Sequence, residues 1–341
     1  MHHIIYLFLL TILSGCLGPS YFWQSINGHF DLLSKRVPIQ KLIDAKTTSA
    51  KLKQQLEKTV KYRAFAEKTL LLPTKGTFNS YADLKRHKAT WVVFASQPYK
   101  LAPKKWCFPV TGCLNYLGYF NEADAHKHGD KLKNLGMDVY IDGSPAYSTL
   151  GWFDDPLLNT FINYADEKLL ALIFHELAHQ KLYIADDPTL NESYAVAVSQ
   201  IGVTLWFEGQ GNSADILRIN KQLKQKNNFI NNVQTVRKQL AALYTSPLDI
   251  TTKQRQKEAI LKAVGKKYAH TWPKEWFSKG LNNAKLNSAN TYSRLVPQIM
   301  AVFNKEGRDI VKFHKTIEKI SKSAPAKREA ILNSFVGVSD G

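Results

Sequence analysis

Four side chains near the middle of the chain have the types and the spacing of a metal site. His175 and His179 stand four positions apart in "FHELAHQKLY", so on a helix they lie on one face, about one turn from each other, and can reach the same ion. Glu176 adjoins the first histidine, where a carboxylate in the HExxH pattern lies beside the metal-bound water. Zinc in a hydrolytic site needs a third protein ligand and one open position for water, and Glu192 in "LNESYA" is the candidate.

The alternative is a pair of ordinary amphipathic helices with core or surface histidines. HExxH arises by chance in roughly one chain of this length in a hundred, counting its fixed positions alone. Here the pattern lies on a strongly helical segment, and an Asn-Glu pair opens a second helix after it. This context favours the metal site.

Two predicted helices must bring these residues together. The first spans residues 166 to 184, with Asp166 as a candidate N-cap and an apolar stripe on one face. The stripe consists of Leu169, Leu170, Ile173, Phe174 and Leu177. The connector "YIADDPTL" predicts a tight turn, after which Thr189 or Asn191 could cap the second helix. Antiparallel helices joined so closely can place Glu192 near both histidines.

The rest of the chain predicts an α+β fold in which helices predominate, with a small sheet packed beside a helical body. Apolar residues at helical spacing predict helices over residues 21 to 72. The β-branched and aromatic runs "TWVVFAS" and "LNYLGYF" predict strands between residues 90 and 120. A helix over "EADAHKHGDKLKNLG", closed by Gly136, and the strand "MDVYID" follow, and from Asp166 onward nearly everything is helical in pattern.

The N-terminus predicts a secretion signal. The apolar run from Ile4 to Leu13 is too short for a bilayer-spanning helix, which needs about 20 residues, so a processed signal is favoured. The run ends in Leu13-Ser14-Gly15-Cys16, which resembles the lipobox of bacterial lipoproteins, with Cys16 as the lipidated first residue after cleavage. An ordinary cleaved signal or a buried helix is the alternative. Leu17, in place of Asp, favours the outer membrane over the inner membrane.

The predicted domain organisation is a signal peptide over residues 1–16 and a single domain over residues 17–341. No tandem repeat or low-complexity linker in the sequence marks a sharper boundary. Within the domain we expect a helical part to about residue 85, a sheet-containing part over about 86–160, metal-binding helices over about 165–210 and a helical part over about 211–341.

The composition is that of a globular protein with a basic surface. Of 341 residues, 44% are hydrophobic and 22% are charged, which excludes a disordered or fibrous chain. The 46 Lys and Arg outnumber the 28 Asp and Glu, giving a net charge of +18 that suits an anionic membrane surface or a nucleic acid. The basic residues are spread through the second half without an aromatic-rich nucleic-acid motif. We therefore expect solvated basic helix faces and no nucleic-acid partner.

Two cysteines predict a disulfide. Cys107 and Cys113 bracket a segment that contains the turn formers Pro109 and Gly112. An even pair of cysteines in an oxidising periplasm favours a disulfide, which would stabilise the fold by about 2 kcal/mol on the chain-entropy argument. Two free buried thiols are the alternative.

Several segments resemble known metallopeptidases. "HELAH" followed by "LNESYA" resembles the gluzincin class, and the chain from about residue 16 to 320 resembles a bacterial lipoprotein family of predicted zinc-dependent aminopeptidases. The supporting segments are "WCFPVTGC", "AYSTLGWFDDP", "LIFHELAHQKLY", "NESYA" and "LNNAKLNSANTYSRLVP". The resemblance implies a gluzincin-like fold, one Zn²⁺ held by His175, His179 and Glu192, and Glu176 as general base. Val196 stands where thermolysin-like enzymes often carry an acid that orients a histidine ligand, so that partner must come from elsewhere.

Hydrolysis at such a centre also needs a donor for the developing oxyanion. Tyr147 and Tyr292 are the candidates, with a plain core position as the alternative for each. In "YSTLGWFDDP", Asp154 or Asp155 could bind the free α-amino group of a substrate, with a role in the turn before the proline as the alternative.

Two further pairs of polar residues are weaker candidates. Asn283, with Asn282, could bind the substrate backbone from a loop, and a plain turn is the alternative. His126 and His128 stand two apart on a predicted helix and do not face each other, so we expect them to be exposed to solvent.

Together these residues predict a zinc-dependent peptidase, an aminopeptidase by resemblance, anchored in the cell envelope by a lipid on Cys16. A zinc endopeptidase acting on envelope proteins or peptidoglycan peptides is the alternative among enzymes, and a catalytically silent binding lipoprotein is the alternative from another class. Glu176 beside two correctly spaced histidines argues against the silent protein. We expect a peptide substrate, the membrane as partner through the lipid, a periplasmic location and a monomer.

Overall fold

The computed structural model describes residues 18–108, 111–149, 152–273, 275–278 and 280–336. Within these residues the fold is α+β and predominantly helical, which confirms the expected class. The predicted signal sequence and Cys16 lie outside the described residues, so both the signal and the lipobox stay predictions. No helix in the described part of the chain has both the length and the apolar character needed to cross a bilayer.

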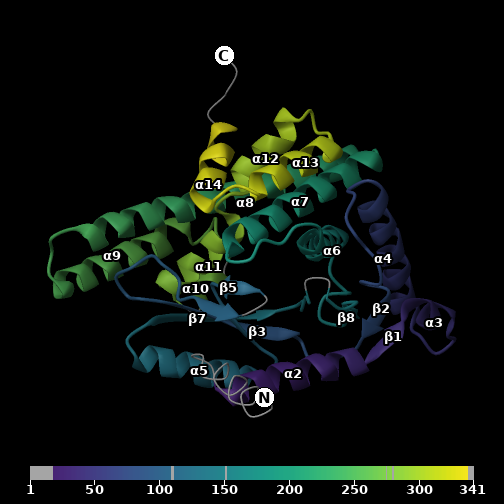
Figure 1. The fold of residues 1–341 in the computed structure, drawn as a ribbon, viewed down its shortest axis with the longest axis horizontal. Coiled ribbons are helices and arrows are strands. Elements are labelled where there is room, and N and C mark those ends of the chain that lie inside the picture. The colour runs from purple at the N-terminus through teal and green to yellow at the C-terminus, as the bar shows by residue number, and fades with distance from the viewer. Residues whose placement is uncertain (1–17, 109–110, 150–151, 274, 279, 337–341) are drawn as a thin grey trace, which may run out of the picture.

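The N-terminal part consists of three helices with two short strands among them (Figure 1). The helices are α2 (Pro19–Ser34), α3 (Ile39–Asp44) and α4 (Ala50–Lys68), and the strands are β1 (Arg36–Pro38) and β2 (Ser80–Ala82). β2 pairs antiparallel with β1 and parallel with β8, which spans Leu157–Leu158. The sequence predicts only helices here and misses both strands, because three residues are too few to show the alternation of a strand.

A three-stranded antiparallel sheet follows, in the order β6-β3-β7. Its strands are β3 (Thr90–Ser96), β6 (Leu117–Tyr119) and β7 (Asp138–Ser144), and α5 (Glu122–Asn134) connects the last two. Val93 and Ala95 of β3 share a buried cluster with Ala125 and Leu132 of α5, whereas Val92 faces a cavity on the opposite side. The predicted strands and helix are confirmed, including the closing Gly136, whose φ of +74° an L side chain rarely adopts.

The disulfide between Cys107 and Cys113 is formed. It joins the two strands of a separate hairpin, β4 (Trp106–Phe108) and β5 (Gly112–Leu114), in which the two cysteines are direct cross-strand partners. The prediction of a disulfide is therefore confirmed.

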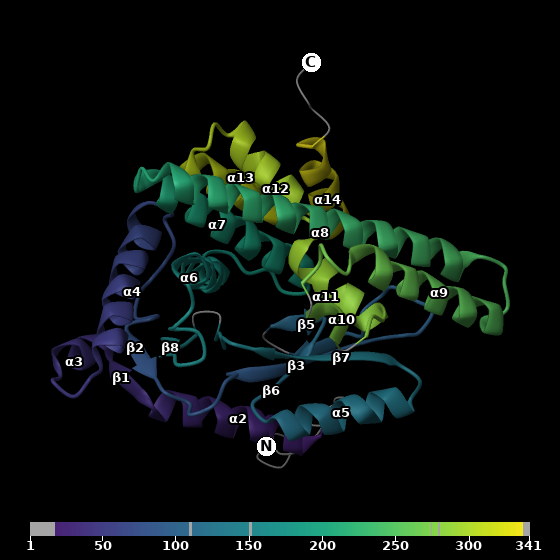
Figure 2. The ribbon, with the colours of Figure 1, turned by 180° about the vertical axis from the view of Figure 1, so that it is seen from behind.

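From Asp166 to the C-terminus the described chain is helical, as predicted. The helices are α6 (Asp166–Lys181), α7 (Pro188–Gly209), α8 (Ser213–Thr245), α9 (Ile250–Tyr268), α10 (Glu275–Ser278), α11 (Asn283–Ser293), α12 (Val296–Lys305), α13 (Ile310–Ser321) and α14 (Pro325–Ser334). Both views place α7 between α6 and the layer that contains α8 and α12 (Figures 1 and 2). Sixteen of the 22 residues of α7 are buried, as expected for a helix with neighbours all round.

The contact between α6 and α7 is close. All five residues of the predicted apolar stripe on α6 are fully buried. A Cβ atom at Gly202 of α7 would lie 2.5 Å from the ring of Phe174 of α6, so glycine lets the two helices approach. The caps differ from those predicted: Asp166 is the first residue of α6 and binds Lys58 at 2.9 Å, and Asp187, not Thr189 or Asn191, caps α7.

The layers of the molecule can be followed in both views. α2 and α5 lie along one edge, with the strands of the sheet above them and the helical body beyond (Figures 1 and 2). α8 and α9 extend sideways from the body as an antiparallel pair. α2 therefore forms part of the outer edge of the molecule, on the side of the sheet away from the C-terminal helices.

Candidate metal centre

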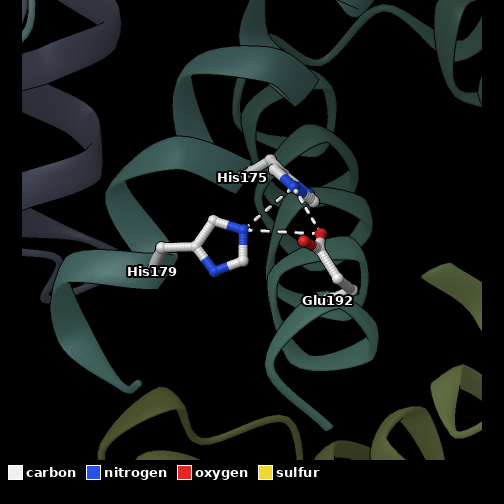
Figure 3. Close-up of side chains that lie close together, drawn as sticks. All are labelled: His175, His179 and Glu192. Carbon is white, nitrogen blue, oxygen red and sulfur yellow. Dashed lines mark hydrogen bonds and ion pairs between the residues drawn. The ribbon is translucent and has the colours of Figure 1, made fainter. Parts of the chain in front are cut away.

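α6 and α7 bring the three predicted ligands to one point (Figure 3). His175 Nε2 lies 3.2 Å from His179 Nε2 and 3.3 Å from Glu192 Oε2, and His179 Nε2 lies 3.5 Å from the same oxygen. In the part of the chain that the structure describes, this is the one group of histidine, cysteine and acidic side chains whose ligand atoms converge closely enough for a metal ion.

These separations fit the donor set of a tetrahedral zinc site. Zinc binds histidine nitrogen and carboxylate oxygen at about 2.0–2.2 Å, so two ligand atoms of one tetrahedron are about 3.3–3.5 Å apart. The three observed distances of 3.2, 3.3 and 3.5 Å agree with that geometry. Glu192 Oε2 is buried, and the two imidazole nitrogens lie 3.3 and 3.5 Å from it, an arrangement that suits a ligand atom aimed at an ion.

The charges at the centre also suit a metal ligand set. Burial raises the pKa of Glu192, but the charges and hydrogen bonds of His179 and His175 outweigh it and lower the pKa to about 2. Burial lowers the pKa of His179, and the nearby Glu192 carboxylate raises it above its ordinary value. Glu192 is therefore ionised at neutral pH.

The partner that should orient His179 is not found among the described side chains. Its Nδ1 atom is buried and makes no hydrogen bond to any described residue. Val196 is buried in the wall of the cavity beside the ligands and offers no acceptor from its side chain. The orienting partner thus remains a prediction.

A cavity of about 630 Å³ opens beside the ligands, and Glu176 lines it. A volume of this size lies within the range of about 300–1,000 Å³ that small-molecule sites span. The side chain of His175 is 18% exposed, against 7% for His179 and 9% for Glu192. The centre is therefore open on the side where His175 and Glu176 face the cavity.

The turn between α6 and α7 is held by Asn191. Its amide nitrogen donates to the carbonyl of Ile184 at 2.7 Å, and its amide oxygen accepts from the backbone N–H of the same residue at 2.9 Å. This pair of bonds closes the chain between Ile184 and the residue next to Glu192. The short connector therefore folds Glu192 back toward the histidines, as the sequence predicts.

The disulfide hairpin braces the same turn. The backbone N–H of Cys113 donates to Asp186 Oδ1 at 2.7 Å, and the hydroxyl of Tyr183 donates to the carbonyl of Thr111 at 2.9 Å. Gly112 has a φ of +71°, and a Cβ atom there would lie 2.6 Å from the backbone nitrogen of Asp186. Only glycine allows the hairpin to pack so closely against the turn.

The two candidate tyrosines occupy different places. The ring of Tyr292, from α11, is stacked on that of His175 with 6.5 Å between the centroids, and the residue lines the cavity. Burial, and then the Glu192 charge, raises the pKa of Tyr292 well above its ordinary range, so its hydroxyl stays protonated. Tyr147 also lines the cavity, but its hydroxyl lies 3.2 Å from His29 Nδ1 of α2.

The two candidate aspartates lie outside the cavity wall. Asp154 is exposed, and its backbone carbonyl accepts a hydrogen bond from Arg36 at 3.1 Å. Asp155 is 2% exposed and accepts hydrogen bonds from the backbone N–H and the hydroxyl of Thr149 at 2.8 and 2.9 Å. Burial raises the pKa of Asp155 to about 6 despite the Thr149 hydrogen bonds. These contacts show that Asp154 and Asp155 stabilise the loop before Pro156, which is the alternative to a role in binding the substrate.

The asparagines and the remaining histidine pair also make structural contacts. Asn282 caps α11 by accepting from the N–H of Lys285, and Asn283 is fully buried, with its amide nitrogen donating to the carbonyls of Gln97 and Pro98. His126 is exposed, as expected. His128 is not: it is half-buried, with its ring beside Trp106 and Tyr119, because it faces the sheet under α5.

Tyr116 and Lys226 are among the residues of the cavity wall that the sequence does not single out. Tyr116 follows the hairpin, and burial, then the Glu192 charge, raises its pKa well above the ordinary range. Lys226, from the long α8, also lines the cavity. Tyr116 lies in a run that predicts a strand, and Lys226 lies in a basic helix. No pattern around either residue therefore predicts a place in a cavity.

A comparison with known protein families identifies one match. A family model described as "Putative aminopeptidase" matches residues 20–332 of the chain. No curated protein and no solved structure matches the chain.

Proposed function

The chain belongs to the family described as putative aminopeptidases, and on that premise we propose that it is a zinc-dependent peptidase. The observation that carries the proposal is the spacing of His175, His179 and Glu192, whose ligand atoms lie 3.2–3.5 Å apart at the side of a cavity. Two imidazoles and one carboxylate form a donor set that zinc hydrolases use, with a further position left for water. Such a set supports a gluzincin-type site.

The residues of the chain have distinct roles in the proposed hydrolysis. When bound, Zn²⁺ acts as a Lewis acid that makes water more acidic and polarises the scissile carbonyl. Glu176 accepts a proton from the attacking water and delivers it to the leaving amine. Tyr292 donates a hydrogen bond to the oxyanion as charge develops there. The apolar part of the cavity wall holds the substrate side chains and limits access of bulk water.

The cavity wall also supports a second candidate, an endopeptidase. Among the described residues of the wall, the acidic side chains are Glu176 and Glu192, and the lysine is Lys226. An aminopeptidase must hold the α-ammonium group of its substrate near the scissile bond, and both carboxylates already have roles at the centre. Internal cleavage needs no such carboxylate.

The cellular setting belongs to the same proposal. Cys16 in its lipobox-like sequence would carry a lipid that anchors the protein on the periplasmic side of the envelope, at the outer membrane in preference to the inner membrane. The Cys107–Cys113 disulfide supports an oxidising compartment. The substrate would be a peptide of the envelope, and the protein would act as a monomer.

One comparison of substrates tests the function. Purified wild type and Glu176→Gln are given the same peptide library, once with free and once with acetylated N-termini. We expect wild type to cleave the first bond of free peptides, and Glu176→Gln to be slower by about 10²–10⁴-fold with its zinc content unchanged. Internal cuts in acetylated peptides would instead support the endopeptidase. Equal rates for the two proteins would contradict the role of Glu176, and no cleavage by wild type would support the silent lipoprotein.

A further inference from the structure

α2 is apolar on two opposite faces, and only one of them is covered. Its inner face packs on the protein: Leu32 is buried, Tyr21 packs edge-to-face against Tyr119, and a Cβ atom at Gly28 would collide with Phe120. On the opposite face Trp23 is 68% exposed, Ile26 51% and Phe30 61%. Their spacing of three and four places them on one stripe of the helix. A helix that is apolar all round is normally covered all round.

The loop that contains Trp152 and Phe153 extends this apolar face. Trp152 is 70% exposed and Phe153 48%, and the ring of Phe153 lies 4.7 Å from that of His29 of α2. Arg36, directly after α2, donates a hydrogen bond to the carbonyl of Asp154 at 3.1 Å. These two contacts hold the loop against the helix, and the His29 ring that Phe153 contacts lies 5.6 Å from the ring of Phe30. We call Phe22, Trp23, Ile26, Phe30, Trp152 and Phe153 the aromatic patch.

The patch is unusual for the surface of this protein. Within the ranges that the structure describes, every Phe and Trp that is exposed belongs to it, since the other exposed large apolar residues are Leu, Ile and Val. Tryptophan and phenylalanine have a high preference for the interfacial region of a bilayer. Scattered single apolar residues need no explanation, but a contiguous aromatic cluster marks a contact surface.

The position of the patch in the chain favours a lipid surface as its occupant. Cys16 precedes Pro19 by three positions, so the chain between them can extend to about 10 Å at most. A lipid on Cys16 would therefore keep the patch at the bilayer. α2 also lies along the outer edge of the molecule, so its outer face can lie flat on such a surface (Figure 1).

A basic run near α2 carries charge that is complementary to anionic headgroups. Lys85, Arg86, His87 and Lys88 form a basic run that lines a surface hollow, and the Arg86 guanidinium interacts with the charge of Asp31 on α2. The whole chain carries a net charge of +18.

We propose that the aromatic patch is a membrane-contact surface that enters the headgroup region of a phospholipid bilayer beside the lipid on Cys16. The inference rests on the envelope location in the proposed function and not on peptide hydrolysis. α2 is the wall between this surface and the cavity, because Tyr21 and Ser25 on its inner side line the cavity. An α-helix with its side chains is about 10–12 Å across, so the cavity lies about one helix diameter from the lipid.

A nitroxide probe tests the contact directly. Cys107 and Cys113 are joined in a disulfide, so a cysteine introduced at Ile26 can be labelled selectively. Mass spectrometry then counts the nitroxide labels on each chain and shows whether Cys16 carries a lipid. Ile26→Cys and the control Leu217→Cys, where the leucine on α8 is 70% exposed, are each labelled in the full mature chain. Each protein is bound to vesicles of phosphatidylethanolamine and phosphatidylglycerol. The relaxation of the label by oxygen is compared with that by a polar nickel complex.

We expect the label at position 26 to become several-fold more accessible to oxygen than to the nickel complex when vesicles are present, and the label at position 217 to stay aqueous. The combined substitution Trp23→Ser, Phe30→Ser and Trp152→Ser should return the label at position 26 to water, with the circular dichroism unchanged because all three side chains are exposed. An aqueous label at position 26 on a lipidated chain would overturn the inference while leaving the anchor intact. Spin coupling between copies at position 26 would show that a second copy covers the patch and would also overturn it. If the label at position 26 enters the lipid but the protein cleaves no peptide, the membrane-contact surface is supported and only the proposed peptidase activity is contradicted.

Discussion

The hydroxyl of Tyr147 lies 3.2 Å from Nδ1 of His29, so this tyrosine joins the loop before β8 to α2. The hydroxyl thereby has a partner outside the group of His175, His179 and Glu192. Tyr292 instead stacks on His175, with 6.5 Å between the ring centroids. The geometry separates two residues that the sequence offers as equal candidates for the oxyanion donor, and it favours Tyr292.

The kinetics of three tyrosine variants should reflect this difference. Tyr292→Phe should lower kcat by about 10²–10³-fold, the loss that follows removal of one oxyanion donor, with little change in KM. Tyr147→Phe and Tyr116→Phe are matched controls from the same cavity and should keep kcat close to wild type. Steady-state rates on one peptide of the library check this. A large loss in Tyr116→Phe alone would assign the donor to the residue that the sequence missed.

Zinc should bind once per chain and stabilise the fold through the three ligands. An ion that binds only the folded state adds about 2.7 kcal/mol to the free energy of unfolding when free zinc exceeds Kd by 100-fold. Wild type should show this rise in urea denaturation, and Glu192→Gln and His179→Ala should not. Metal analysis after dialysis gives the stoichiometry. Glu176→Gln is the control that should keep the full rise, because Glu176 is not a ligand, and the same rise in Glu192→Gln would place the ion elsewhere.

Asp155 should make the protein more stable as the pH falls from 7 toward 4. Burial raises the pKa of its carboxyl from 3.8 to about 6, so the folded state binds this proton more tightly than the unfolded chain. The stabilisation is complete below the unfolded pKa and is lost as the pH rises through the folded pKa. The free energy of unfolding of wild type minus that of Asp155→Asn should therefore rise on acidification, by on the order of 2 kcal/mol. The other titrating side chains are the same in both proteins, so their contributions to the free energy of unfolding cancel in the subtraction. If the subtracted value did not change with pH, the raised pKa of Asp155 would be contradicted.

Removal of the disulfide should destabilise the fold moderately. Replacing both cysteines with serine frees a short loop, and the chain-entropy argument gives a loss of about 2 kcal/mol in the free energy of unfolding. Urea denaturation measures it, and wild type kept in a reducing agent should show the same loss. If both proteins unfold at the wild-type midpoint, the crosslink does not stabilise the folded state.

Local patterns in the sequence predict much of the fold and of the metal centre. The apolar stripe of α6 sets which face is buried, and the four-residue spacing of His175 and His179 then places both imidazoles on the side toward α7. Gly136 ends α5 because a positive φ suits glycine. These features depend on residues that are close in sequence.

Features that depend on distant segments could not be predicted. The cavity wall combines Ser25 of α2, Tyr116 after the hairpin and Lys226 of α8, and no local pattern links them. Of the neighbouring residues Asp186 and Asp187, Asp186 also has a role that depends on a distant segment, the disulfide hairpin. The sequence offers Thr189 or Asn191 as the cap of α7, whereas Asp187 caps it and Asp186, with a φ of +66°, turns to the hairpin.

The hydrogen bond from the Cys113 backbone to Asp186 couples the disulfide hairpin to the candidate metal centre. Asp186 belongs to the connector that returns Glu192 to the histidines, and its donor lies on a hairpin that the disulfide crosslinks. A chain with reduced thiols keeps His175, His179 and Glu192 but lacks that crosslink. We therefore expect the connector to be held less firmly in the reduced chain, and the affinity of that chain for the proposed zinc ion to be lower than that of the oxidised chain.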